Sequence, residues 1–137
     1  MAKDIFHRIV KEALVTDGWT VTHDPLAIPY GQQDLYVDLG AERLLGAERG
    51  NEKIAVEIKS FISRSQVDDL ENALGQYLLY RSILKREQPE RIIYLAVSIT
   101  VYDGILSTPL GRVALEDYQV KLLIFEPEEA KIYKWIQ

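Results

Sequence analysis

The sequence contains no cysteine, and this absence excludes several kinds of site. Without thiols the chain cannot form a disulfide, a thiolate zinc centre or a cysteine nucleophile. Its only two histidines, His7 and His23, are separated in sequence, so a histidine zinc site is not expected either. A chain without cysteine fits the cytoplasm, and we expect a cytoplasmic protein.

Long apolar runs and an excess of positive charge are also missing. No stretch reaches the roughly 18 apolar residues of a membrane-spanning helix, and the charged N-terminus is unlike a secretory signal, so we expect no membrane contact. Lys and Arg number 16 against 21 Asp and Glu, which gives a formal net charge of -5. This balance argues against non-specific binding to a polyanion, although enzymes that hold metal ions need carboxylates.

The sequence does contain enough apolar material for one folded domain. Hydrophobic residues make up 47% of the chain, and there are no internal repeats or linker-like segments, which favours a single domain spanning residues 1–137. The periodicity of the first half predicts a helix from Asp4 to Gly18, strands at 19–24 and 34–39 around a loop at 25–33, and a hairpin that turns at Gly50-Asn51. The second half predicts a helix over 67–87, a strand at 91–99, a short helix around 103–117 and two closing strands. This order predicts a mixed α/β fold in which helices flank a central sheet.

The segment KIAVEIKSF (residues 53–61) is the most informative part of the chain. Isoleucine and valine alternate on one face of the expected strand, while Glu57 and Lys59 fall on the opposite face. If the hairpin turns at Gly50-Asn51, opposed residues have numbers that sum to about 101, so Lys59 faces Glu42. Asp38 shares the parity of Glu42, and two or three carboxylates could therefore meet beside one lysine.

Such a cluster is unfavourable without a cation, because two carboxylates about 4 Å apart repel by about 4 kcal/mol at an effective dielectric constant near 20. Mg²⁺ (or Mn²⁺) relieves this repulsion, prefers oxygen ligands and can activate water for attack on a phosphate. The lysine can position that water or neutralise developing charge. The same Glu-x-Lys spacing recurs at Glu129 and Lys131, however, and on an exposed strand such a pair is usually a solvated ion pair worth under about 1 kcal/mol.

The whole chain resembles the XisH family, known as fdxN element excision controlling factors in cyanobacteria. The stretches that carry the resemblance are AKDIFHRIVKEALVTDGWTVTHDPL, DLYVDLGAERLLGAE, KIAVEIKSF and ALGQYLLYR, which run through most of the first 81 residues. An acid, a hairpin and then Glu-x-Lys also resemble the PD-(D/E)xK nuclease superfamily, which has a restriction-endonuclease-like fold. The resemblance implies an α-β-β-β-α-β core, with DNA as the substrate and Mg²⁺ as the cofactor of a nuclease.

The superfamily motif assigns roles to residues of this chain. Glu57 and Lys59 take its second acidic and lysine positions, and the main-chain carbonyl of Ile58 would be a metal ligand. We favour Asp38 for the first acidic position, although it does not follow a proline as the motif requires. Two alternates remain open: Asp34 and Glu42.

The two predicted helices before and after the hairpin hold further candidates. Gln76 and Tyr80 match the Gln-x-x-x-Tyr element of some RecB-like nucleases and share a helical face, so Gln76 could assist positioning, with Tyr80 as an alternate. It is equally compatible with the sequence that Tyr80 is a core residue and Gln76 is solvated. Glu12 lies beside His7 and Lys11 where some relatives of this fold place an acid, but an exposed helix face explains these three residues as well.

Three functional hypotheses remain. The first is a Mg²⁺-dependent endonuclease that acts on DNA during excision, and a homodimer would suit it because cutting both strands of a duplex commonly uses two related sites. The second, which the resemblance also implies, is a non-catalytic recombination accessory that binds a site-specific recombinase or a second small factor called XisI. The third is an α/β interaction module whose acidic residues are incidental surface charges.

Overall fold

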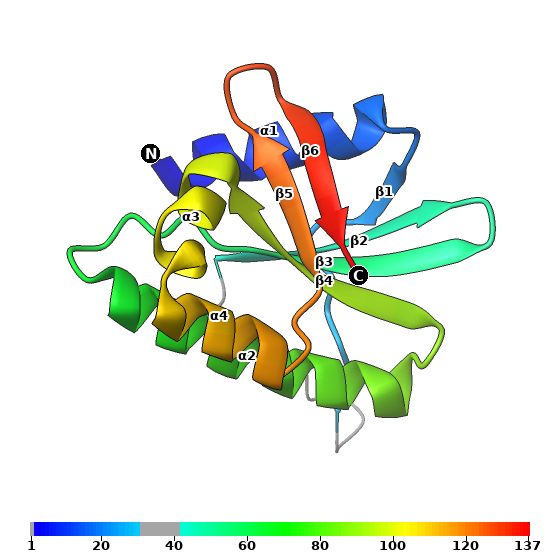
Figure 1. The fold of residues 1–137 in the computed structure, drawn as a ribbon. Helices are drawn as coiled ribbons and strands as arrows, with labels where there is room; N and C mark the ends of the chain where they lie inside the picture. The colour runs from blue at the N-terminus through cyan, green and yellow to red at the C-terminus, as the bar shows by residue number, and fades with distance from the viewer. Residues whose placement is uncertain (1, 31–41) are drawn as a thin grey trace.

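A computed structural model describes residues 2–30 and 42–137 and places them around one six-stranded sheet (Figure 1). Its strands lie side by side in chain order: β1 (Thr20–His23), β2 (Arg43–Arg49), β3 (Glu52–Ile58), β4 (Arg91–Ser98), β5 (Leu122–Glu126) and β6 (Lys131–Ile136). The β3-β4 and β4-β5 pairs are parallel and the other pairs are antiparallel. The predicted strand at 34–39 lies outside the described residues.

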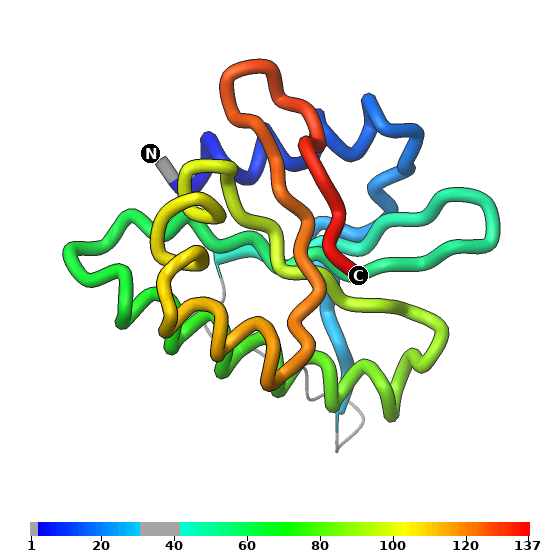
Figure 2. Tube along the Cα trace, in the orientation of Figure 1, coloured from blue at the N-terminus to red at the C-terminus, as the bar shows by residue number. Residues whose placement is uncertain are grey.

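Helices cover both faces of this sheet, so the predicted mixed α/β fold is confirmed (Figure 2). They are α1 (Ala2–Thr16), α2 (Gln66–Glu87), α3 (Ile99–Asp103), the 3-10 helix η1 (Ile105–Ser107) and α4 (Pro109–Asp117). The predicted order of helix, strand, hairpin, helix and strand is likewise found. No helix within the two described ranges is long and apolar enough to cross a bilayer.

The single short helix predicted around 103–117 is wrong. The chain forms α3, η1 and α4 there instead, with breaks at Gly104 and Thr108. Proline cannot donate the backbone hydrogen bond of a helix interior, so Pro109 begins a new helix. The Thr108 side chain caps that helix by accepting a hydrogen bond from the Gly111 amide at 3.2 Å.

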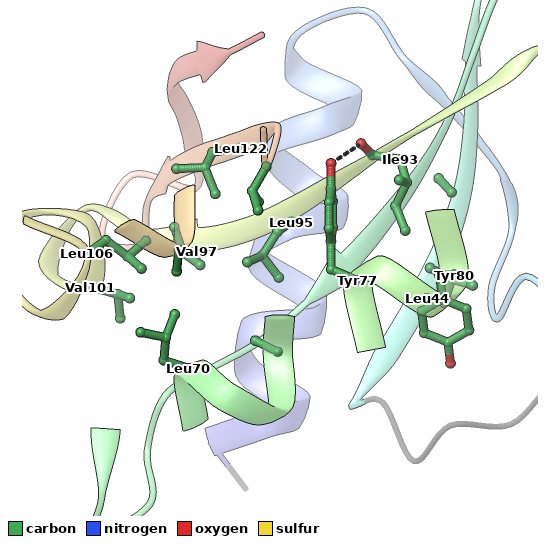
Figure 3. Close-up of a cluster of buried hydrophobic side chains, with 14 of the residues drawn as sticks. Leu44, Leu70, Tyr77, Tyr80, Ile93, Leu95, Val97, Val101, Leu106 and Leu122 are labelled. Carbon is green, nitrogen blue, oxygen red and sulfur yellow. Dashed lines mark hydrogen bonds between the residues drawn. The ribbon is translucent and has the colours of Figure 1, made fainter. Parts of the chain in front are cut away.

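The sheet separates two hydrophobic cores. On one face the apolar stripe of α1, including Val10 and Leu14, packs against the isoleucine and valine side of β3. On the other face α2 packs against β2, β3, β4 and β5, and Figure 3 shows its Tyr77 directed at the carbonyl of Ile93. Both faces of β3 are therefore covered, and this arrangement determines the environment of Glu57.

Candidate active site

The hairpin formed by β2 and β3 places Glu57 opposite Leu44, as the predicted register requires. The pairing runs without a bulge from the turn to Arg43, which lies opposite Ile58. Because side chains alternate across a strand, Ile58 enters the core beneath α1 while Glu57 lies on the face that α2 covers. The Ile58 side chain therefore lies on the face opposite Glu57, so Ile58 could contribute to that site only through its main-chain carbonyl.

Glu57 is a carboxyl group completely enclosed by protein. Its side chain is 0% exposed, and within residues 2–30 and 42–137 neither Oε1 nor Oε2 has a hydrogen-bond partner. Burial raises the pKa of Glu57 from 4.5 to about 8; the charge of Lys59 opposes this shift and that of Glu42 adds to it. A carboxyl group with this pKa is mostly protonated at pH 7 when no cation is beside it.

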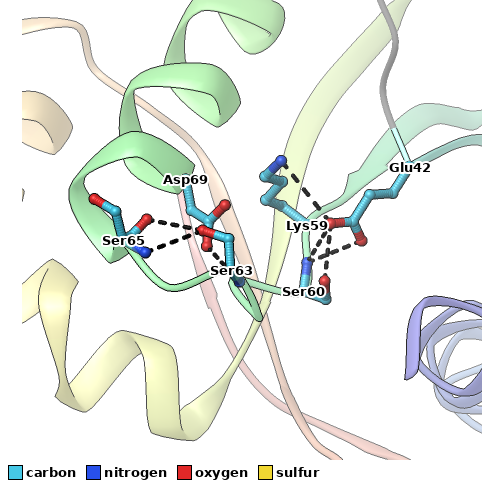
Figure 4. Close-up of polar contacts among 6 residues, drawn as sticks. All are labelled: Glu42, Lys59, Ser60, Ser63, Ser65 and Asp69. Atoms are coloured by element: carbon cyan, nitrogen blue, oxygen red, sulfur yellow. Dashed lines mark hydrogen bonds and ion pairs between the residues drawn. The ribbon is translucent and has the colours of Figure 1, made fainter. Parts of the chain in front are cut away.

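Lys59 and Glu42 form the polar part of the site (Figure 4). The Lys59 ammonium lies 3.9 Å from a Glu42 oxygen, and the two side chains are only 12% and 6% exposed. Ser60 donates two further contacts to Glu42, from its amide at 3.1 Å and from its hydroxyl at 2.8 Å. Glu42 is thus held by charge-assisted hydrogen bonds.

The chain turns sharply after Ser60 and enters α2 through a second set of polar contacts. Phe61 has a left-handed backbone (φ 55°), a conformation that costs a side-chain-bearing residue about 1 kcal/mol, and its buried ring anchors this turn. The buried Asp69 carboxylate accepts a hydrogen bond from the Ser63 amide at 3.1 Å, as Figure 4 shows. The Ser65 side chain caps α2 by accepting a hydrogen bond from the Asp68 amide.

Sequence reasoning missed the roles of Ser60 and Asp69. A serine directly after the lysine, and an acid in the first turn of a capped helix, are common enough to carry no specific signal. Their contacts depend on how the loop between β3 and α2 folds back over the strand ends. Both are positioning residues, because they fix Glu42 and this loop.

The remaining predicted site residues lie in different environments. Tyr80 is a core residue, 3% exposed, and Gln76 is half-buried on the same helix with its Oε1 enclosed. Glu12 is exposed on α1, which covers the opposite face of the sheet, so the structure does not bring it to Glu57. Asp34 and Asp38 lie outside the described residues.

The donor atoms around Glu57 partly fit a magnesium ion. Two carboxylate oxygens that have no hydrogen-bond partner in the described part of the chain suit a hard cation that prefers oxygen, and an ion there would supply such interactions. Glu42, in contrast, already accepts hydrogen bonds at both oxygens. Within residues 2–30 and 42–137, no three acidic or histidine side chains gather to hold a metal, so a complete octahedral site needs Asp38, Asp34, main-chain oxygens or water.

The family profile described as "XisH protein" matches residues 1–133 of this sequence. The chain belongs to the XisH family. A crystal structure of an XisH family protein from Nostoc punctiforme is 42% identical, with a TM-score of 0.89, and the match covers 98% of this chain and 100% of that chain. A crystal structure of an fdxN element excision controlling factor protein from Anabaena variabilis is 38% identical, with a TM-score of 0.89 and coverage of 98% and 99%.

These two crystal structures therefore share the fold of this chain over nearly its whole length. A comparison with curated proteins gives no match. Membership in the XisH family confirms the family resemblance seen in the sequence.

Proposed function

We propose that this protein is a controlling factor for site-specific excision of a DNA element and that it acts as a Mg²⁺-dependent endonuclease through Glu57 and Lys59. The biological setting is supported by the XisH family and by the relative from Anabaena variabilis, which is described as an fdxN element excision controlling factor. The chemistry is supported by one observation above all: a fully buried carboxyl group, with no hydrogen-bond partner among the described residues, lies on the same strand face as a shielded lysine.

In this proposal Glu57 and the carbonyl of Ile58 would hold the ion, together with Asp38 or Asp34. A bound Mg²⁺ would polarise a phosphate oxygen and lower the pKa of a coordinated water. Lys59 would donate a hydrogen bond to the attacking water or to the phosphate oxygen that gains charge, and its aliphatic stem is already shielded from solvent. Glu42 would keep the ammonium group in place and Gln76 would assist in positioning the phosphate.

The test is Mg²⁺-dependent nicking of supercoiled plasmid and of branched DNA by the purified protein. Wild type should cleave at least one of these substrates, and Glu57→Gln and Lys59→Met should each lower the rate by about a hundredfold or more. The matched control is the second Glu-x-Lys pair, because Glu129→Gln and Lys131→Met change the same residue types on an exposed surface. A wild-type protein that never cuts either substrate would exclude the nuclease activity.

A second candidate function is a non-catalytic excision accessory that binds a recombinase or an XisI-like factor. It is favoured by the formal net charge of -5, which suits a protein partner better than naked DNA. Two results together would favour this function. The wild-type protein would show no nicking activity, and Glu57→Gln and Lys59→Met would bind the recombinase or the XisI-like factor with the affinity of wild type.

A further inference from the structure

The first half of β4 has one uncovered edge. β3 pairs with β4 from Arg91 onward, whereas β5 pairs with it only from Leu95 onward. In the part of the chain that the structure describes, no strand therefore lies beside residues 91–94 on the β5 side. Figure 1 shows this half of β4 extending past the start of β5 and the end of β6. We call residues 91–94 the open edge.

Main-chain groups of the open edge point to its uncovered side. The Leu95 amide donates a hydrogen bond to the Lys121 carbonyl at 2.9 Å. Alternate residues of a strand direct their main-chain groups to the same side, so the Ile93 amide and the Arg91 carbonyl point there too. The Tyr77 hydroxyl donates a hydrogen bond to the Ile93 carbonyl at 3.4 Å and accepts one from the Lys121 amide at 3.0 Å, so a side chain ends the β4-β5 ladder. An extended peptide can pair with the main-chain groups before this point.

Ile92 is the exposed residue of the open edge. Its side chain is 47% exposed, whereas every other residue of β4 is buried. Proteins usually protect an uncovered strand edge with charge, proline or a bulge, because such an edge pairs readily with another chain. The one charged side chain among residues 91–94, that of Arg91, is buried and donates hydrogen bonds to Gln88 and to the Ile54 carbonyl. The open edge is therefore apolar and unprotected.

Two pockets adjoin the open edge, one on each face of the sheet, and Ile92 and Lys121 line both of them. The α2-side pocket has a volume of about 180 Å³ and apolar walls from Leu84, Pro89 and Ile93. The α1-side pocket, about 470 Å³, lies on the opposite face. Successive side chains of a strand point to opposite faces, so a peptide paired with the open edge would place its side chains alternately in these two pockets.

The two pockets differ in charge. No carboxylate lines the α2-side pocket, whereas Arg81 and Lys85 line it one helical turn apart, and like charges at this spacing repel. Neither forms an ion pair within residues 2–30 and 42–137; Arg81 donates instead to the Tyr118 carbonyl at 2.7 Å. The α1-side pocket is lined by Glu52 and Glu90 as well as by cations, so it favours neither sign. The α2-side pocket therefore suits an apolar side chain with a carboxylate near it.

We propose that the open edge of β4 binds an extended segment of a partner protein by strand addition. One apolar side chain of that segment fills the α2-side pocket, and an acidic side chain two residues away, on the same face, pairs with Lys85 or Arg81. The side chain between them lies in the α1-side pocket. Docking here does not require cleavage at Glu57, and it provides a surface for the partner of the second candidate function.

The test is an NMR titration of the ¹⁵N-labelled full chain, in EDTA, with an acetylated and amidated peptide of sequence TTLTDTT. Threonine favours an extended peptide, and the leucine and aspartate point to the same face. A saturable shift of the Ile93 amide signal is expected. Replacing the leucine by alanine, or the aspartate by lysine, should weaken binding about tenfold or more. Of two peptides N-methylated at alternate residues, one should lose binding and the other should keep it, because an added strand pairs along a single edge.

Variants at two exposed positions locate the peptide. Ile92→Asp and Lys85→Glu should each weaken binding of TTLTDTT about tenfold or more, and Lys85→Glu should instead prefer the peptide with lysine in place of aspartate. The matched controls Val113→Asp and Lys131→Glu make the same changes at exposed positions elsewhere and should bind like wild type. Glu57→Gln should also bind like wild type, which separates this proposal from the nuclease proposal.

Several results would overturn the assignment. They are an Ile93 amide signal that no peptide shifts, equal binding of the two N-methylated peptides, and wild-type affinity in both Ile92→Asp and Lys85→Glu. A blunt DNA duplex that shifts the same signals and displaces the peptide would make nucleic acid the occupant. A dimer in sedimentation equilibrium that Ile92→Asp dissociates would make the occupant a second copy of this chain.

Discussion

Glu57 is the residue whose properties depend most on its surroundings. A glutamate on an exposed strand ionises near pH 4.5, but burial raises the pKa of Glu57 to about 8. That difference corresponds to roughly 5 kcal/mol of unfavourable free energy when the folded protein is forced to ionise this group. The residue therefore destabilises the fold at high pH unless a cation offsets its charge.

The first prediction concerns the pH dependence of stability in metal-free solution. Between pH 4.5 and about 8 the folded state keeps a proton that the unfolded state releases, so the contribution of Glu57 to stability falls as pH rises. Glu57→Gln should consequently be more stable than wild type by several kcal/mol at about pH 9, with little difference at about pH 4. Urea denaturation at both pH values measures this, and Glu129→Gln should show no such change.

At the scale of elements, the β2-β3 hairpin was predictable and the loop after it was not. Residue parity alone placed Lys59 opposite Glu42, because alternation and the turn at Gly50-Asn51 determine the register. The hydrogen bond from the Ser63 amide to the Asp69 carboxylate depends on where α2 begins relative to the strand, which no local pattern specifies. Likewise, the short-range pattern at 99–117 did not reveal that Gly104 and Pro109 divide it.

Two helical glycines provide a prediction at this scale. Gly75 in α2 has open space where a Cβ would be added, so Gly75→Ala should stabilise the protein by about 0.5–1 kcal/mol. A Cβ at Gly111 in α4 would overlap the Ile105 carbonyl oxygen and lie 2.6 Å from the Leu106 Cα, both of them backbone atoms. Gly111→Ala should therefore lower stability by at least about 1–3 kcal/mol, and thermal denaturation of the pair would show opposite signs.

At the scale of the whole molecule, the sheet separates the core beneath α1 from the core beneath α2, and Glu57 lies on the α2 side.

Metal binding supplies the prediction for the whole molecule. If Glu57 takes part in holding a divalent ion, millimolar Mg²⁺ or Mn²⁺ should raise Tm, by the equivalent of about 2.7 kcal/mol when the ion is at a hundred times its Kd. Glu57→Gln should lose this increase and Lys131→Met should keep it. A wild-type Tm that does not respond to either ion would contradict a metal at this position.

The sequence by itself determined which side chains could share a face. Hydrophobic alternation placed Glu57 and Lys59 on one face of the strand and Ile58 on the other. The hairpin turn placed Glu42 opposite Lys59. Both results follow from the short-range geometry of a strand and its turn. Only the tertiary structure decided that Glu57 is completely buried. Its desolvation requires elements distant in sequence, here α2 packed over β3, so local periodicity cannot specify it.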